Sequence, residues 1–126
     1  MKTLRNLSAL LAIFVLANPV ISCKSNSEIL KSATTIQKYE VIIDNRTQEE
    51  FDAGHIKGAI LIPYTEIEQK IAEAVPDKST SIGVYCRSGR RSGIARNAML
   101  KLGYKNVVNI GGMEEAAKKV GLPIVK

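Results

Sequence analysis

The feature of this 126-residue chain that most restricts its fold is the alternation of short β-branched runs with segments of helical periodicity. Short apolar runs bounded by Gly, Pro or charged residues are typical of strands that are buried on both faces. The segments between them repeat apolar residues every three or four positions, which is typical of amphipathic helices. The alternation predicts an α/β fold, in which helices cover both faces of a parallel sheet.

The expected elements follow one another along the chain in a simple order. We expect strands at Tyr39–Asp44, Ala59–Ile62, Ser81–Tyr85 and Asn106–Ile110. We expect helices at Ser27–Lys38, from Thr47 onward, and at Thr65–Val75, Ser92–Leu102 and Met113–Val120. Gly111 and Gly112 are expected to form a turn between the last strand and the last helix.

Particular residues support the helices. Thr47 and Glu50 have the spacing of a capping box, so a short helix should begin there and bury Phe51. Gly103 should stop the helix that begins at Ser92. The side chains expected to face the core from the two middle helices are Ile67, Ile71, Ala74 and Val75, and Ala95, Met99 and Leu102.

The start of the chain has the composition of a signal peptide. Lys2 and Arg5 precede the apolar run Leu7–Ala17, which is too short to span a membrane. The residues before Cys23 resemble the lipobox of bacterial lipoproteins, so we expect Cys23 to carry lipid and anchor the protein to a membrane. The alternative is ordinary signal cleavage before an unmodified Cys23. Either way the protein is expected in the periplasm or cell envelope.

This leader divides the chain into a signal peptide (1–22), a tether with an N-terminal helix (23–38) and a folded domain (39–126). A hydrophobic content of 45% excludes a disordered chain. Two cysteines and one histidine exclude a disulfide framework and argue against a Cys/His zinc site, so no metal or other cofactor is expected. The net charge is +6, but no aromatic residues alternate with the basic ones, so a nucleic-acid partner is not expected.

One loop concentrates the reactive chemistry. It lies between a predicted buried strand and the N-terminus of a predicted helix, where backbone N–H groups and the helix dipole favour an anion. Glycine inside the loop permits a backbone angle that other residues avoid, and three arginines surround it. These features lower the pKa of a cysteine thiol and make it nucleophilic. The residues of the loop are Cys86, Arg87, Ser88, Gly89, Arg90, Arg91 and Ser92.

A structural role for Cys86 is the alternative, since a free cysteine often behaves as a small buried hydrophobic residue. The immediate neighbours of Cys86 in the loop are Arg, Ser and Gly rather than apolar residues. This polar surrounding favours the reactive thiol.

Several motifs in order resemble those of a single-domain rhodanese, closest to the exported phage-shock protein E type. They are Asp44-Asn45-Arg46, Glu50–Ile60, the Cys86–Ser92 loop and Gly111-Gly112, within a match from about Glu40 to Ile124. The resemblance implies a rhodanese-like α/β fold with a central parallel five-stranded sheet and helices on both faces. Two positions depart from the family pattern: Asn45 replaces a more common apolar residue, and Ala116 replaces an aromatic one.

The resemblance also implies a sulfurtransferase reaction in two steps. The Cys86 thiolate attacks the outer sulfur of thiosulfate, sulfite leaves, and a cyanide or thiol acceptor then removes the sulfur from the Cys86 persulfide. The backbone N–H groups from Arg87 to Ser92 would hold the persulfide. Arg87 and Arg91 would bind the anionic donor, and Arg90 would face outward.

Three nearby polar residues are expected to support the scaffold. His55 should hydrogen-bond backbone at a turn rather than act as a base for the cysteine. Asp44 and Arg46 are expected to be structural, with an ion pair between Arg46 and Glu50.

Other functions remain open from the sequence. A cysteine-loop phosphatase places arginine six positions after the nucleophile, but here that position is Ser92 and Arg91 comes at five. A persulfide carrier of the same fold would hold sulfur for a partner without rapid turnover. A thiol–disulfide oxidant is disfavoured because no second cysteine lies near Cys86 in the sequence.

Overall fold

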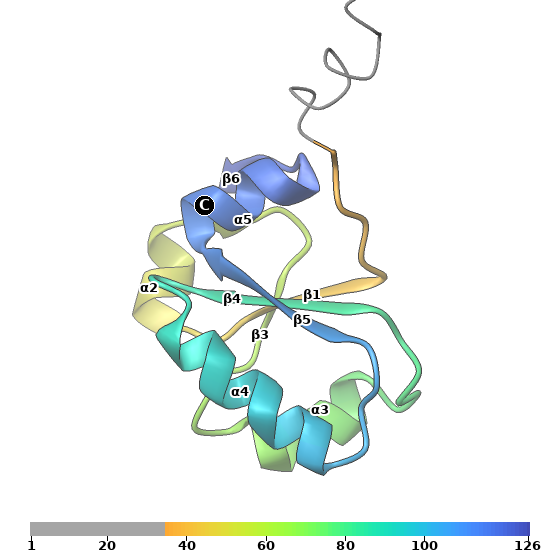
Figure 1. Ribbon diagram of the computed structural model, residues 1–126. Helices are drawn as coiled ribbons and strands as arrows, with labels where there is room; N and C mark the ends of the chain where they lie inside the picture. The colour runs from red at the N-terminus through yellow and green to blue at the C-terminus, as the bar shows by residue number, and fades with distance from the viewer. Residues whose placement is uncertain (1–34) are drawn as a thin grey trace, which may run out of the picture. The chain divides into compact units, whose positions relative to one another are not determined.

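Four parallel strands form the central sheet of residues 35–126, which are the residues that this computed structural model describes (Figure 1). Their order across the sheet is β3, β1, β4, β5, and each neighbouring pair is parallel. The parallel α/β architecture expected from the sequence is confirmed. The bounds of the strands are β1 Val41–Asp44, β3 Ile60–Leu61, β4 Ile82–Cys86 and β5 Val107–Gly112.

The central sheet has four strands rather than the expected five. Two additional short strands, β2 (His55–Ile56) and β6 (Ile124–Val125), pair antiparallel in a separate two-stranded sheet. A two-residue strand is too short to show a periodicity in the sequence, and its partner lies far along the chain. The location of these strands therefore depends on tertiary pairing.

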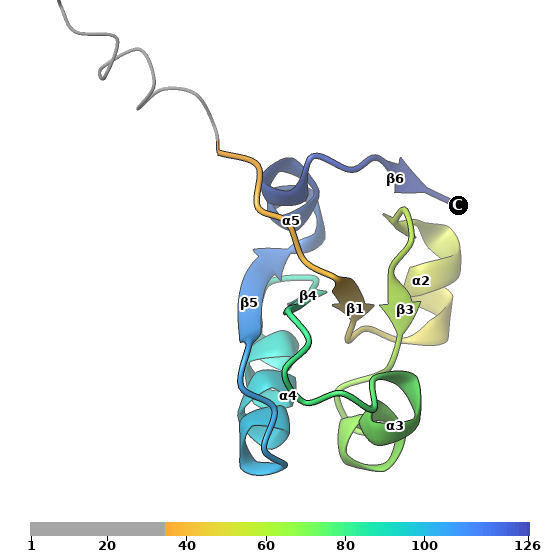
Figure 2. The same ribbon diagram turned by 90° about the vertical axis from the view of Figure 1, so that its right-hand side faces the viewer.

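Helices pack on both faces of the central sheet, as Figure 2 shows from the side. Helices α3 (Ile67–Ala74) and α4 (Arg90–Lys101) cover one face, and α5 (Met113–Val120) covers the other. Each face has its own apolar core. The α3/α4 core includes Ile43, Ile71, Val84 and Met99, and the α5 core includes Ile42, Tyr85, Ile110 and Ala116.

Helix α2 (Gln48–Ala53) begins with the predicted capping box. Thr47 Oγ1 accepts a hydrogen bond from the Glu50 N–H, and the Glu50 carboxylate accepts one from the Thr47 N–H. The expectation that Phe51 is buried was wrong: Phe51 is half-buried, and its ring stacks on the His55 ring with 3.7 Å between centroids. No residue of α2 is fully buried, so the helix covers the domain surface without an apolar stripe of its own.

The helix α4 begins two residues earlier than expected, at Arg90. Gly89 caps it with a backbone φ of 93°, a left-handed conformation that favours glycine. Leu102 was expected in the core but is exposed, because it lies at the C-cap where the helix ends before Gly103. Ala74 was also expected in the core and is exposed at the end of α3.

Two further expectations were wrong at the margins of the domain. Ala59–Ile62 was read as a buried strand, but β3 is an edge strand and Ile60 is exposed. Residues 35–38 are not helical, so the predicted helix Ser27–Lys38 does not include its last four positions. The rest of that helix, the signal peptide (1–22) and Cys23 lie outside the described residues. No helix within 35–126 combines the length and apolar composition needed to cross a membrane.

The two cores predict where a truncated side chain destabilises the fold. Ile71 is fully buried between α3 and the sheet, whereas Ile94 on α4 is 45% exposed. We expect Ile71→Ala to lower the free energy of unfolding by about 2–5 kcal/mol, because it removes apolar contacts and leaves a cavity. The matched variant Ile94→Ala should change it by less than about 1 kcal/mol. Urea denaturation measures both, and equal losses would contradict this assignment of the core.

Candidate functional site

The cysteine loop lies where β4 ends and α4 begins. Cys86 is the last residue of β4, and α4 starts four residues later at Arg90. The Cys86 side chain has 0% exposure, while Arg87, Ser88 and Arg90 of the loop are exposed. The sulfur therefore lies at the base of a short exposed loop, at the carboxyl end of a central strand, where ligands bind in open α/β sheets.

Hydrogen-bond donors of the loop point at the Cys86 sulfur. The Gly89 N–H donates to Sγ at 3.0 Å, and the Ser92 hydroxyl lies 3.5 Å from Sγ. The φ of 93° at Gly89 turns this N–H inward. The N–H groups of Ser88 and Ser92 also stabilise the thiolate. The start of α4 adds its dipole to these donors, because the N-terminus of a helix carries partial positive charge.

The pKa of Cys86 reflects two opposed effects. Burial raises the pKa of the thiol, because it removes the charged form from water. Hydrogen bonds from the Ser92 hydroxyl and from the N–H groups of Ser92, Ser88 and Gly89 outweigh burial and lower the pKa from 9.0 to about 7. A large fraction of Cys86 is therefore thiolate at neutral pH, which is the nucleophilic form.

The two glycines of β5 allow the cysteine loop to approach the sheet closely. Gly112 pairs with Cys86 in the register of β4 and β5, and a Cβ on Gly112 would lie 2.6 Å from the Arg87 carbonyl oxygen. The prediction of a turn at Gly111 and Gly112 was wrong, because β5 continues through both residues. The register of β5 instead shifts by one residue between Asn109 and Gly111, an irregularity that re-aims the end of the strand.

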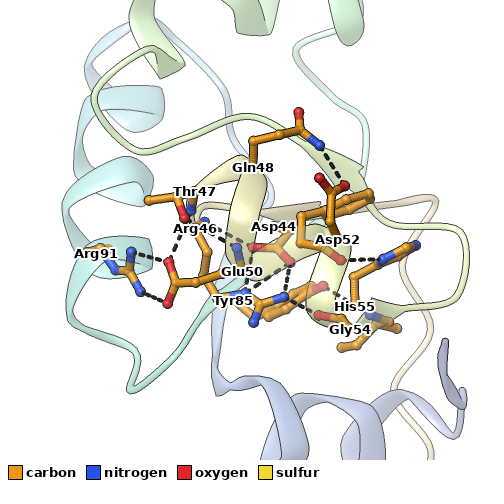
Figure 3. Close-up of polar contacts among 12 residues, drawn as sticks. Asp44, Arg46, Thr47, Gln48, Glu50, Asp52, Gly54, His55, Tyr85 and Arg91 are labelled. Carbon is orange, nitrogen blue, oxygen red and sulfur yellow. Dashed lines mark hydrogen bonds and ion pairs between the residues drawn. The ribbon is translucent and has the colours of Figure 1, made fainter. Parts of the chain in front are cut away.

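Arg91 makes a bidentate ion pair with Glu50 of α2, which the sequence did not indicate (Figure 3). The two terminal guanidinium nitrogens, Nη1 and Nη2, each donate to one carboxylate oxygen at 2.8 Å. The hydrogen bonds and charge of Arg91, together with hydrogen bonds from Thr47, outweigh burial and lower the pKa of Glu50 to about 2. The expected pair of Arg46 with Glu50 was wrong, since Arg46 pairs with Asp44 at 2.6 Å and Glu50 with Arg91.

The buried pair of Asp44 and Arg46 supports the carboxyl end of β1. Arg46 donates three side-chain hydrogen bonds to the Asp44 carboxylate and one to the Gly54 carbonyl. Its guanidinium also lies over the Tyr85 ring, 5.7 Å from the centroid, and the Tyr85 hydroxyl accepts the Ile56 N–H. Figure 3 shows Arg46 beside Asp44, Gly54 and Tyr85. The contacts join β1, β4 and the segment after α2.

His55 contacts backbone as expected rather than the cysteine. Its Nδ1 lies 2.9 Å from the Phe51 carbonyl oxygen, and its ring stacks on Phe51. No contact between His55 and Cys86 occurs among the hydrogen bonds of residues 35–126. The lowered pKa of Cys86 is explained without a histidine base.

A cleft of about 750 Å³ opens beside the loop. Its lining includes Arg46, Glu50, Arg87, Gly112, Met113 and Lys118. Cys86 is not itself part of this lining, but its chain neighbour Arg87 and its β5 partner Gly112 are. The cleft is thus adjacent to the buried sulfur, and both basic and acidic side chains face it.

The comparison with known protein families gives the same family that the cysteine loop and the parallel sheet suggest. Residues 26–119 match the family described as the Rhodanese-like domain. The chain belongs to the rhodanese-like family. The resemblance expected from the sequence motifs is confirmed.

Relatives within this family indicate the type of reaction. The thiosulfate sulfurtransferase PspE of Escherichia coli (strain K12) is 43% identical over 84 residues, which cover 67% of this chain and 77% of PspE. A solved structure described as a rhodanese with anions from E. coli is 41% identical, with a TM-score of 0.62 and coverage of 68% of this chain and 96% of that one. Sulfurtransferase-type chemistry is supported by these relatives.

Not every relative is named a sulfurtransferase. A tRNA uridine(34) hydroxylase of Yersinia enterocolitica is 35% identical over 92 residues, but the match covers only 26% of that protein. The rhodanese domain is therefore shared by proteins with different names, and the particular reaction of this rhodanese is inferred from its own site.

Both departures from the family pattern are buried. Asn45 is fully buried, and its Nδ2 donates to the Ile62 carbonyl oxygen, while its Oδ1 has no hydrogen-bond partner in the described part of the chain. Ala116 is fully buried in the α5 core. Sequence reasoning missed two other residues at the site, Glu50 as the partner of Arg91 and Asn109 as a partner of the loop. The sequence singled out Glu50 for the capping box and as an expected partner of Arg46, not of Arg91, and nothing singled out Asn109.

The Glu50–Arg91 pair predicts a loss of stability in acid. The folded-state pKa of Glu50 is about 2, below its ordinary value of 4.5, so the pair stabilises the fold above that ordinary value and is lost as pH falls toward 2. We expect Glu50→Gln to lower the free energy of unfolding at pH 7 by about 1–2 kcal/mol, a value reduced by partial solvent screening. The variant should also flatten the decline between pH 4.5 and 2. Urea titrations at several pH values measure both effects.

Glu49→Gln is the matched control, because Glu49 lies on the same helix turn and is exposed. It should leave the acid dependence close to that of the wild type. An unchanged acid dependence in Glu50→Gln would show that the ion pair contributes nothing to stability.

Proposed function

We propose that this rhodanese is a thiosulfate sulfurtransferase that uses Cys86 as its nucleophile. The observation that carries the proposal is a buried thiol with a pKa of about 7, surrounded by N–H and hydroxyl donors rather than by a histidine base. A thiolate in such a loop is suited to attack an electrophilic sulfur atom. The identity to the thiosulfate sulfurtransferase PspE supports thiosulfate as the donor.

The proposed reaction has two displacement steps. The Cys86 thiolate attacks the outer sulfur of thiosulfate, a new S–S bond forms, and the original S–S bond breaks with its electron pair leaving on sulfite. The Cys86 persulfide then carries the transferred sulfur. An acceptor thiolate attacks the outer persulfide sulfur and forms a bond to it. The bond between Cys86 Sγ and the transferred sulfur breaks, and Cys86 regains its thiolate. Cyanide as acceptor gives thiocyanate by the same displacement.

The charges around the loop support an anionic donor. Arg87 and Arg90 are exposed at the loop and have no ion-pair partner among residues 35–126, so both are available to a dianion. Arg87 also lines the cleft beside Gly112. Arg91 is held by Glu50 and also interacts with the charge of Cys86. We propose that Arg91 stabilises the thiolate rather than the departing sulfite. Ser88, Gly89 and Ser92 would hold the persulfide through the N–H groups that now face Sγ.

A persulfide carrier is the second candidate. The complete burial of Cys86 favours it, because a buried persulfide is protected from solvent thiols. A phosphatase is less favoured, since Arg91 lies five positions after Cys86 and is already bound to Glu50. Turnover with small acceptors separates the enzyme from the carrier.

We also propose that the protein is exported and acts in the cell envelope. The proposal rests on the signal-peptide pattern of residues 1–22 and on the lipobox-like residues before Cys23. Intact mass of membrane-extracted protein would reveal acyl chains on Cys23.

The central test is sulfur loading of Cys86. After thiosulfate treatment we expect the intact mass to rise by one sulfur atom, and cyanide to remove that sulfur with release of thiocyanate. Cys86→Ser should show neither change, because a serine hydroxyl is not ionised at neutral pH. Stable loading without turnover would favour the carrier. Phosphatase turnover without sulfite release would overturn the proposal.

Arg87 should contribute to donor binding. We expect Arg87→Ala to lower kcat/KM for thiosulfate by about 10–100-fold, the range for losing a charge-assisted hydrogen bond to an anion. Lys101→Ala removes an equal charge at the far end of α4 and should leave kcat/KM close to wild type. Steady-state sulfite release measures both variants, and equal effects would mean that Arg87 acts only through net charge.

A further inference from the structure

Asn109 of β5 contacts the cysteine loop at two points. Its Nδ2 donates to the Gly89 carbonyl at 2.8 Å, and its Oδ1 lies 2.8 Å from the Ser92 hydroxyl. The Gly111 N–H also donates to Oδ1, at 3.1 Å. These partners fix the orientation of the amide, because the Gly111 N–H can only donate and the Gly89 carbonyl can only accept. Asn109 Oδ1 can therefore only be an acceptor for the Ser92 hydroxyl.

The Ser92 hydroxyl has one proton and three acceptors within reach. They are Asn109 Oδ1 at 2.8 Å, the Gly89 carbonyl at 3.1 Å and Cys86 Sγ at 3.5 Å. The Gly89 carbonyl already accepts from Asn109 Nδ2 and from the Gly93 N–H. The main competition for the Ser92 proton is thus between the amide oxygen of Asn109 and the sulfur of Cys86.

Which of the two acceptors binds the Ser92 hydroxyl depends on the charge of the Cys86 sulfur. A thiolate attracts the hydroxyl strongly, because hydrogen bonds to ionised acceptors are roughly twice as strong as neutral ones. A neutral thiol is a weak acceptor, and so is Sγ in a persulfide whose charge has moved to the outer sulfur. In those states the Asn109 amide oxygen is the better partner.

We propose that Asn109 is a positioning residue that acts through Ser92: its Oδ1 accepts the hydrogen bond of the Ser92 hydroxyl while Sγ is uncharged, and the hydroxyl donates to Sγ instead when the thiolate forms. The persulfide part of this inference rests on the proposed function, whereas the thiol part does not. Breaking the Asn109–Ser92 bond opposes ionisation of Cys86, so Asn109 makes the thiolate less stable than Ser92 alone would make it.

The ionisation of Cys86 also responds to charged groups near the sulfur. Arg91 of α4 is the charged group whose interaction with Cys86 is evident, and Glu50 of α2 pairs with it. The contacts of Asn109 described above involve neither residue. A neutral substitution at Asn109 therefore leaves this ion pair in place.

The experiment is a double-mutant cycle on Asn109 and Ser92, with the pKa of Cys86 read from the pH dependence of iodoacetamide alkylation. We expect Asn109→Leu, which is close in size and uncharged, to lower the pKa of Cys86 by about 0.5–1 unit. Ser92→Ala should raise it, because a donor to the thiolate is lost. In the Ser92→Ala background, Asn109→Leu should cause no further change.

If Asn109→Leu lowers the pKa of Cys86 equally in the Ser92→Ala background, the inference is overturned, because a general loosening of the loop would act in both backgrounds. A rise in the pKa of Cys86 in Asn109→Leu would overturn it as well. If Asn109→Leu does not fold, Asn109→Ala replaces it in the cycle, since a smaller residue lets water reach the Gly89 carbonyl. Sulfite release from thiosulfate by the same proteins reports separately on the proposed function. If the effect of Asn109→Leu on the pKa of Cys86 depends on Ser92 but no sulfite is released, the role of Asn109 stands and the sulfurtransferase is rejected.

Discussion

The set of hydrogen bonds to the Cys86 sulfur, from the Ser92 hydroxyl and from loop N–H groups that include Gly89 at 3.0 Å, is the interaction on which the site depends. A buried thiol without donors would have a raised pKa and would be inert, because burial penalises the thiolate. The inward N–H requires a left-handed backbone at Gly89, and the same glycine caps α4. One residue thus turns the chain, starts the helix and supplies a donor to the sulfur.

Two polar contacts and one close backbone approach hold the loop from different parts of the chain. The Glu50 carboxylate of α2 binds Arg91, the Asn109 amide of β5 binds Gly89 and Ser92, and Gly112 lets the Arg87 carbonyl pack against β5. Farther from the sulfur, the buried Asp44–Arg46 pair fixes the end of β1 against Tyr85. A buried ion pair adds little net stability, since both charges lose water on burial, but loss of one partner leaves an uncompensated charge. The arrangement is consistent with a reactive group that is preorganised rather than flexible.

Local patterns predicted local structure well. Four features all depend on residues close in the sequence: the capping box of Thr47 and Glu50, the bounds of α5, the presence of a strand directly before the cysteine loop, and the contact of His55 with backbone. The errors occurred where distant segments decide the outcome. Gly111 and Gly112 have the composition of a turn, but pairing with β4 extends them into a strand. Phe51 has the character of a core residue, but the position of α2 leaves it half-buried against a histidine ring.

The amino-acid sequence by itself determined the alternation of strands and helices, the family, and a cysteine placed between a buried strand and a helix N-terminus. These features depend on periodicity, glycine conformation and neighbouring residue types, all of which are local. Only the tertiary structure decided which carboxylate binds which arginine and which side chain reaches the Ser92 hydroxyl. Glu50 and Arg91 are 41 residues apart, and Asn109 and Ser92 are 17 apart. Contacts over such separations are set by how the sheet and helices pack, because many partners of suitable charge are available along the chain and packing brings only one of them within hydrogen-bond distance.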